Sequence, residues 1–158
     1  MLNLGTLLLK GSRFSKVSGQ FGEILVAYLL SKNGFEVAQV DHSGLDILAF
    51  RRKPEKRLGI SVKNRARNPK NPNWSVNFRL EDLKRLKQAC EAFSAEPFVA
   101  AVVDRLSENV SVWMLPLNEA RKHNTVGEKN LYFAVTKKAQ WKYRNVSDAF
   151  YASLRWEP

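Results

Sequence analysis

The chain has 158 residues, of which 44% are hydrophobic and 26% charged, proportions that are ordinary for a soluble globular domain. A single cysteine, Cys90, excludes a disulfide within the chain and a cysteine metal cluster. Two histidines leave few candidates for a histidine metal site or a Ser-His-Asp triad. The apolar run in residues 1–10 lacks a signal-peptide cleavage site and is too short to span a bilayer. We therefore expect a cytoplasmic protein without a membrane partner.

The net charge of +11 is concentrated in one segment. Residues 51–70 hold nine Lys or Arg residues and one acidic residue, Glu55, so that this stretch carries a net charge of +8. Concentrated positive charge is typical of a protein that neutralises phosphates, which favours a nucleic acid as partner. A solvated face and an acidic protein partner are the alternatives. A membrane surface is disfavoured because no amphipathic helix runs through this segment.

Periodicity predicts one helix and three strands in the first part of the chain. The helix is indicated by apolar residues at three- and four-residue spacing, namely Phe21, Leu25, Tyr28 and Leu29, and Asn33-Gly34 ends it. The predicted elements are a helix over 15–32 and strands over 35–40, 44–52 and 57–65, with 53–56 as a hairpin turn.

Residues 66–74 contain two prolines and three asparagines and are predicted to form a loop. The next segment is a strongly amphipathic helix over 79–96, on which Cys90 is expected to be buried as a small apolar residue. The remaining predicted elements are strands over 97–104, 109–117 and 131–136 and a short closing helix over 146–156. A central sheet with helices on its faces is the natural way to bury these elements, which indicates an α/β fold.

Two charged residues stand on neighbouring predicted strands. Side chains alternate between the faces of a strand, so Gly59, Ser61 and Lys63 share one face of the third strand. Asp46 begins the second strand and can lie close to Lys63. A lysine within an apolar strand loses hydration and needs a partner or a function. The residues alone allow either a structural ion pair or a functional site.

Three segments, GQFGE (19–23), GLDILAF (44–50) and ISVKNR (60–65), together resemble the PD-(D/E)XK nuclease superfamily, and within it archaeal Holliday-junction-resolvase-like and restriction-endonuclease-like proteins. The resemblance implies a restriction-endonuclease-like core, α-β-β-β-α-β, with a central mixed sheet flanked by helices. This core spans residues 15–104 of a single domain, 1–158, and residues 105–158 form a C-terminal extension. The implied activity is a metal-dependent endonuclease that hydrolyses phosphodiester bonds of double-stranded or branched DNA, as in repair. The resemblance to resolvases also suggests a homodimer, although no self-complementary interface is visible in the residues.

The resemblance also assigns roles to residues at the matching positions. Glu23 and Asp46 would be acidic metal-site residues, and the carbonyl of Val62 would be a further ligand. Lys63 would orient or activate the attacking water. The implied cofactor is Mg²⁺ or Mn²⁺, since Mg²⁺ prefers oxygen ligands and is commonly held by one or two carboxylates.

Ser61 departs from the family pattern, which has an acidic residue or glutamine at this position. A serine hydroxyl is neutral and is a weak magnesium ligand, so Asp46 would be the only carboxylate on the strands. Two hypotheses follow: an active nuclease in which Glu23 supplies the second charge, and a catalytically inactive nucleic-acid-binding domain of the same fold.

The candidate nucleic-acid contacts follow Lys63 in the sequence. Arg65, Arg67 and Lys70 are expected on or beside the 66–74 loop, where they can bind backbone phosphates. Trp74 either stacks on a base or packs onto the domain. The sequence does not distinguish DNA from RNA.

Overall fold

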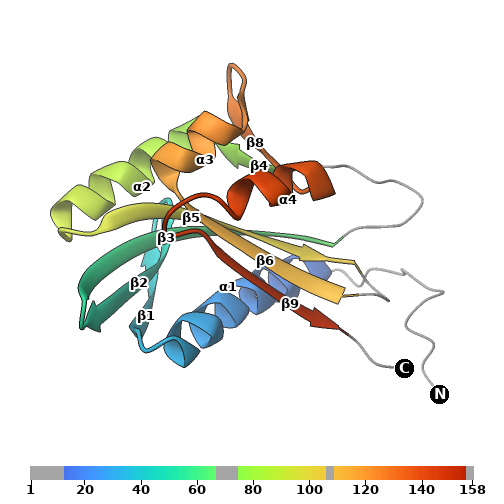
Figure 1. The fold of residues 1–158 in the computed structure, drawn as a ribbon. Coiled ribbons are helices and arrows are strands. Elements are labelled where there is room, and N and C mark those ends of the chain that lie inside the picture. The colour runs from blue at the N-terminus through green and yellow to red at the C-terminus, as the bar shows by residue number, and fades with distance from the viewer. Residues whose placement is uncertain (1–12, 67–74, 106–108, 156–158) are drawn as a thin grey trace.

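The computed structural model describes residues 13–66, 75–105 and 109–155. The elements are α1 (Phe14–Lys32), β1 (Glu36–His42), β2 (Leu45–Arg52), β3 (Glu55–Ala66), β4 (Ser75–Arg79), α2 (Leu80–Ala92), β5 (Glu96–Asp104), β6 (Asn109–Pro116), α3 (Leu117–His123), β7 (Thr125–Val126), β8 (Asn130–Ala134), α4 (Lys137–Tyr143) and β9 (Phe150–Arg155). Six of the strands form one sheet in the order β1-β2-β3-β5-β6-β9 (Figure 1). β3 and β5 run parallel, and the other neighbouring strands are antiparallel. This is the mixed sheet that the sequence predicted.

The helix α1 covers one face of the large sheet (Figure 1). Its buried side chains recur at the spacing that keeps them on one side of a helix, and they are Leu25, Val26, Leu29 and Leu30. These residues pack against alternate positions of β2, β3, β5 and β6, including Ile60 and Val102. Every second residue of these strands therefore faces α1.

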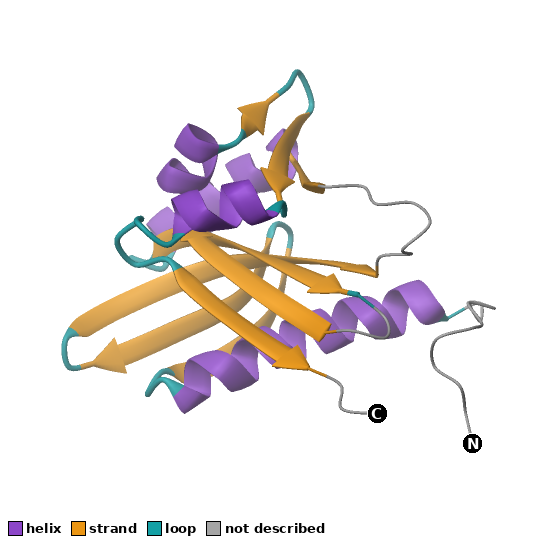
Figure 2. Cartoon of the chain, turned by 45° about the vertical axis from the view of Figure 1, so that its right-hand side comes forward, coloured by secondary structure: helices purple, strands orange, loops and turns teal. Residues whose placement is uncertain are grey.

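The opposite face of the sheet is covered by α2, α3, α4 and a small sheet with strand order β4-β8-β7 (Figure 2). Buried aromatic residues join these parts: the ring of Tyr143 in α4 meets Trp113 of β6 edge-on and also contacts Phe133 of β8. Cys90 of α2 is buried, as predicted, and its thiol lies 3.7 Å from the carbonyl oxygen of Gly59. Burial raises the pKa of this thiol to about 11, so it is an inert part of the core.

The elements that the sequence predicted through residue 104 are present, with ends that shift by a few residues. The second helix is the main difference, because it ends at Ala92 and leaves a short turn before β5 begins at Glu96. The predicted loop at 66–74 lies outside the described residues except for Ala66, which ends β3. Among the described residues, no helix is both long enough and apolar enough to cross a bilayer.

The predicted closing helix over 146–156 is wrong, because Phe150–Arg155 form the strand β9 at the edge of the large sheet. Alternation explains the error. Phe150 and Ala152 pack against the core under α1, whereas Tyr151 points to the other face and stacks on Trp113 with ring centroids 4.0 Å apart. The pairing with β6 selects this two-residue period over the helical one. The sequence prediction also missed β4, α3, β7 and α4, which are two to seven residues long.

Candidate active site

The candidate site begins where β2 and β3 stop pairing. Their antiparallel ladder runs from Arg52–Glu55 to Ile47–Ile60, and Asp46 is the next residue along β2. Beyond the end of this ladder, the Asp46 carboxylate accepts a hydrogen bond of 2.6 Å from the backbone N–H of Val62. This side-chain hydrogen bond joins the two strands where their backbone pairing has ended. The Ser61 hydroxyl donates a longer hydrogen bond of 3.4 Å to the same oxygen. Backbone and side-chain donors of β3 therefore fix this carboxylate before any ligand binds.

Glu23 reaches the site from α1, which lies unusually close to β3. A Cβ atom on Gly22 would stand 2.8 Å from Cβ of Asn64, closer than real atoms of this kind approach. The Asn64 amide also donates to the backbone carbonyl of Ser18 at 2.5 Å and to the Ser18 hydroxyl at 3.0 Å. This contact locks one turn of α1 onto the residue after Lys63, and Glu23 follows Gly22 directly.

The charges of Glu23, Asp46 and Lys63 interact. Partial burial raises the pKa of Glu23, the nearby charge of Asp46 raises it further, and the ammonium group of Lys63 opposes both effects. All three residues are partly exposed at the surface. The structure thus brings together the three charged residues that the sequence motifs singled out, from α1, β2 and β3.

Several neighbouring groups shift the pKa of Asp46, and they do so in opposite directions. Burial raises its pKa above the ordinary value, while the Val62 N–H, the Lys63 charge and the Ser61 hydroxyl lower it. A second carboxylate, that of Asp82 in α2, raises the pKa of Asp46 again. Ionised Asp46 is therefore held in place by its hydrogen bonds, while its burial, and to a smaller extent the charge of Asp82, disfavours the ionised form.

The oxygen atoms of this site fit a hydrated divalent cation. In an extended strand the N–H and C=O of one residue point to the same side, so the Val62 carbonyl lies on the edge of β3 where its N–H meets Asp46. Glu23, Asp46 and this carbonyl offer oxygen ligands of the kind that Mg²⁺ takes together with several waters. Within the described ranges, no three His, Cys, Asp or Glu side chains gather as a metal cage. Oxygen ligands are those that Mg²⁺ and Mn²⁺ prefer, whereas zinc sites in proteins are built mainly from nitrogen and sulfur ligands.

Ser61 lies on the same sheet face as Asp46 and is only 1% exposed. Its hydroxyl hydrogen is directed at the Asp46 carboxylate, so its contact here is with another side chain of the site. Ser61, which departs from the family pattern, thus adds no negative charge to the site and instead donates a hydrogen bond to Asp46.

The basic segment 51–70 is divided by the length of β3. Arg57 and its basic neighbours flank the β2–β3 hairpin, about 20 Å from Lys63 at roughly 3.3 Å per strand residue. Part of their charge is neutralised locally, since Arg57 pairs with Glu55 at 3.1 Å and Lys56 pairs with Asp148. The described basic residues of this segment therefore lie in two separate places, and Lys63 and Arg65 are the ones on the part of β3 that adjoins the candidate site.

Among the predicted nucleic-acid contacts, Arg65 is exposed near the end of β3. Arg67, Lys70 and Trp74 lie outside the described residues. Two further residues that interact with the site, Asn64 and Asp82, were not predicted from the sequence. Asn64 directly follows the motif lysine, and its position beside the motif was a signal that could have found it. Asp82 stands in the first turn of a helix, where an acidic residue is common for reasons unrelated to function.

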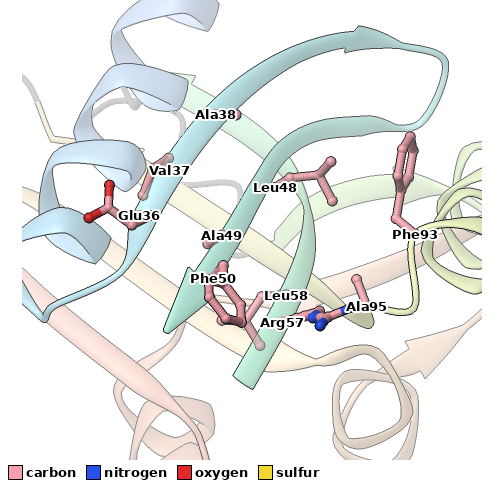
Figure 3. A pocket seen from close by; sticks show the side chains of 10 residues that line it. All are labelled: Glu36, Val37, Ala38, Leu48, Ala49, Phe50, Arg57, Leu58, Phe93 and Ala95. Carbon is pink, nitrogen blue, oxygen red and sulfur yellow. The ribbon is translucent and has the colours of Figure 1, made fainter. Parts of the chain in front are cut away.

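An apolar pocket of about 450 Å³ lies elsewhere on the sheet (Figure 3). Its lining consists of Glu36, Val37, Ala38, Leu48, Ala49, Phe50, Arg57, Leu58, Phe93 and Ala95. None of the three converging charged residues lines it. The pocket and the cluster around Asp46 are therefore separate features of the protein.

A mixed sheet with α1 on one face, and with acidic and lysine side chains where two strands diverge, defines a restriction-endonuclease-like α/β protein. Solved structures support this class. The Holliday junction resolvase Hjc of the archaeal hyperthermophile Archaeoglobus fulgidus is similar over 77% of this chain and 85% of its own, with a TM-score of 0.57 and 21% identity. A bacterial homing endonuclease, I-Ssp6803I, is similar over 81% of this chain and 82% of its own, with a TM-score of 0.51 and 17% identity. No family model and no curated protein sequence matches the chain. The chain has the restriction-endonuclease-like fold that its motifs predicted.

Proposed function

We propose that this protein is a metal-dependent endonuclease that hydrolyses phosphodiester bonds of DNA. The observation that carries the proposal is the convergence of Glu23, Asp46 and Lys63, with the Asp46 carboxylate fixed by the Val62 N–H at 2.6 Å. Perturbed carboxylates beside a lysine, in a fold that nucleases use, form a physically reasoned candidate for catalysis.

Each residue has a distinct part in the proposed site. Glu23, Asp46 and the Val62 carbonyl would hold Mg²⁺ or Mn²⁺. When bound, such an ion lowers the pKa of coordinated water and stabilises negative charge on the scissile phosphate. Lys63 would orient the attacking water and offset the charge that develops on the phosphate. Ser61 would keep Asp46 in the geometry that binding requires.

The proposed substrate is double-stranded or branched DNA, and the proposed location is the cytoplasm. Two observations support a nucleic-acid substrate: the net charge of +11, and the basic residues that continue from Lys63 through Arg65. The branched form is suggested by the fold, since the first of the similar structures is a Holliday junction resolvase. A homodimer would present two such sites to the two strands of one duplex.

Ser61 favours a second candidate, a catalytically inactive nucleic-acid-binding domain of the same fold. Its hydroxyl faces Asp46 where the family pattern has an acidic residue or glutamine, so the proposed ion would be held by two carboxylates from different elements. Binding of DNA without binding of metal would identify this case.

The test combines cleavage, calorimetry and binding. Wild-type protein and the variants Asp46→Ala and Lys63→Ala are incubated with linear, flapped and four-way DNA in Mg²⁺ and in Mn²⁺, whose geometric demands are looser. We expect wild-type cleavage, no cleavage by Asp46→Ala, and DNA affinity that Asp46→Ala leaves largely intact.

If the wild type neither cleaves DNA nor binds metal in calorimetry, the nuclease proposal is wrong. The second candidate, the inactive nucleic-acid-binding domain, would then replace it. DNA binding whose logarithm falls steeply with the logarithm of salt concentration supports either candidate. A flat dependence would instead indicate a protein-interaction domain with an acidic partner.

A further inference from the structure

A fixed arginine stands beside the candidate site. Arg79 ends β4, and its guanidinium binds both oxygens of Asp82, with Nε–Oδ2 at 3.0 Å and Nη2–Oδ1 at 3.1 Å. The Asp82 side chain is 12% exposed, whereas the Arg79 side chain is 66% exposed. A buried carboxylate thus holds one edge of an exposed guanidinium, and the Nη1 edge takes no part in this pair.

The start of α2, which carries this pair, is packed against the turn that leads into Asp46. A Cβ atom on Gly44 would lie 2.6 Å from the backbone oxygen of Asp82, so the β1–β2 turn rests directly on the first turn of α2. Arg85 ties the same turn down, because its Nη1 group donates to the Ser43 hydroxyl at 3.0 Å. In Figure 1 the turn between β1 and β2 lies next to α2. Asp46 follows Gly44 by two residues.

We propose that Arg79 contacts a backbone phosphate of the nucleic acid at this site, and that Asp82 is the positioning residue that holds its guanidinium. The inference rests on the proposed nuclease function and adds a residue from the far side of the site, across from α1. A guanidinium is a planar fork that can bind a carboxylate along one edge and a phosphate along another. Fixing the fork in advance reduces the conformational entropy that phosphate binding would otherwise cost.

A purely structural role for the pair is the competing explanation. Asp82 lies in the first turn of a helix, where an acidic residue is favourable, and Arg79 neutralises it at a spacing of three residues. This explanation places the whole effect of Arg79 in folding stability. If the role is purely structural, replacing Arg79 should change the salt dependence of DNA binding no more than replacing any other surface arginine does.

The experiment measures the affinity of the full chain for double-stranded and four-way DNA by fluorescence anisotropy in metal-free buffer over a range of salt concentrations. Arg79→Ala is compared with Arg57→Ala, a matched control that removes an exposed arginine paired with a glutamate at the hairpin end of β3. We expect Arg79→Ala to weaken binding several-fold and to reduce the slope of log affinity against log salt by about 0.9, the value for a single phosphate neutralised. We expect Arg57→Ala to change the slope little.

Asp82→Asn tests the positioning role. Removing a negative charge near the site would by itself strengthen DNA binding, whereas loss of positioning weakens it. We expect weaker binding in the wild-type background and no further weakening in the Arg79→Ala background, which is the signature of action through Arg79. If Arg79→Ala does not fold because Asp82 keeps only its longer contact with Arg85, at 3.9 Å, Arg79→Gln keeps an N–H donor for the carboxylate and serves in its place.

The outcomes separate this inference from the proposed function. Salt-dependent binding by the wild type together with equal slopes for the Arg79 and Arg57 variants would overturn the inference alone. Stronger binding by Asp82→Asn would overturn the positioning role. Absence of any wild-type binding to double-stranded or four-way DNA would overturn the proposed function, and the inference with it.

Discussion

Replacing Gly22 by alanine tests whether close packing of α1 on β3 positions Glu23. The added Cβ would meet Cβ of Asn64 at 2.8 Å, so the helix and the strand must move apart. Overpacking of this kind costs about 1–3 kcal/mol. Alanine in a helix interior returns up to ~1 kcal/mol relative to glycine. We therefore expect Gly22→Ala to lower the free energy of unfolding by up to about 2 kcal/mol.

Gly19 in the same helix provides the matched control, because a Cβ there meets no atom within 4 Å. Gly19→Ala gains the same helix propensity without the collision and should stabilise the protein by up to ~1 kcal/mol. Denaturant unfolding measures both variants, and DNA cleavage in Mg²⁺ should fall for Gly22→Ala alone. Equal stability and equal activity in the two variants would refute the argument that a close helix–strand contact places Glu23.

Four further predictions follow from the charges of the site. Asp46→Asn should stabilise the metal-free protein at pH 7, because burial raises the pKa of Asp46 and ionised Asp46 opposes folding. Its advantage over wild type in unfolding free energy should shrink as the pH falls through 3.8 and below, where the aspartate of the unfolded chain becomes protonated as well, and an advantage that grows towards low pH would contradict the sign of the shift. Lys63→Ala should lower the cleavage rate by roughly 10²–10³-fold, as removal of a transition-state donor does, and should change DNA affinity less. Ser61→Glu should raise calorimetric Mg²⁺ affinity yet destabilise the metal-free protein by about 1–3 kcal/mol, since the position is buried. Joint replacement of Arg65, Arg67 and Lys70 by alanine should reduce the salt slope of DNA binding by roughly 0.9 for each phosphate that these side chains neutralise, and an unchanged slope would mean that they bind no phosphate.

The elements that the sequence predicted correctly are those whose pattern is long enough to have one interpretation. The apolar spacing of α1 and the continuous apolar run of β5 leave little choice of structure. Phe150–Arg155 allow both a helix and a strand over six residues, and pairing with β6 decides between them. The strand predicted over 131–136 is confirmed as β8, whereas the short strand β4, which the sequence prediction missed, depends on β8 for its hydrogen bonds. Non-local pairing of this kind cannot be seen in either segment alone.

The site was predictable to the extent that it depends on alternation and chain order. Asp46 and Lys63 lie on neighbouring strands because the hairpin register places them there. The closeness of α1 to β3 depends instead on a contact between Gly22 and Asn64, which are far apart in the sequence. The influence of Asp82 on Asp46 also requires the β1–β2 turn to rest on α2. Both features are contacts between segments that are distant in the sequence, so the residues on either side of Gly22 or of Asp82 do not predict them.

The balance of charge around Asp46 gives a physical argument for metal binding despite Ser61. Glu23 and Asp82 each place negative charge near Asp46, from opposite sides of the sheet, and this costs free energy in the metal-free protein. The charge of Asp82 is paired with that of Arg79. For Glu23, the positive charge of Lys63 is the one interaction that lowers the pKa against the effects of burial and of Asp46. A divalent cation held by Glu23 and Asp46 would offset the repulsion between their negative charges. A serine at position 61 then limits the excess negative charge while still donating a hydrogen bond to Asp46. In the proposed site the ion would have few protein ligands, which would leave positions for water and for phosphate oxygens of the nucleic acid.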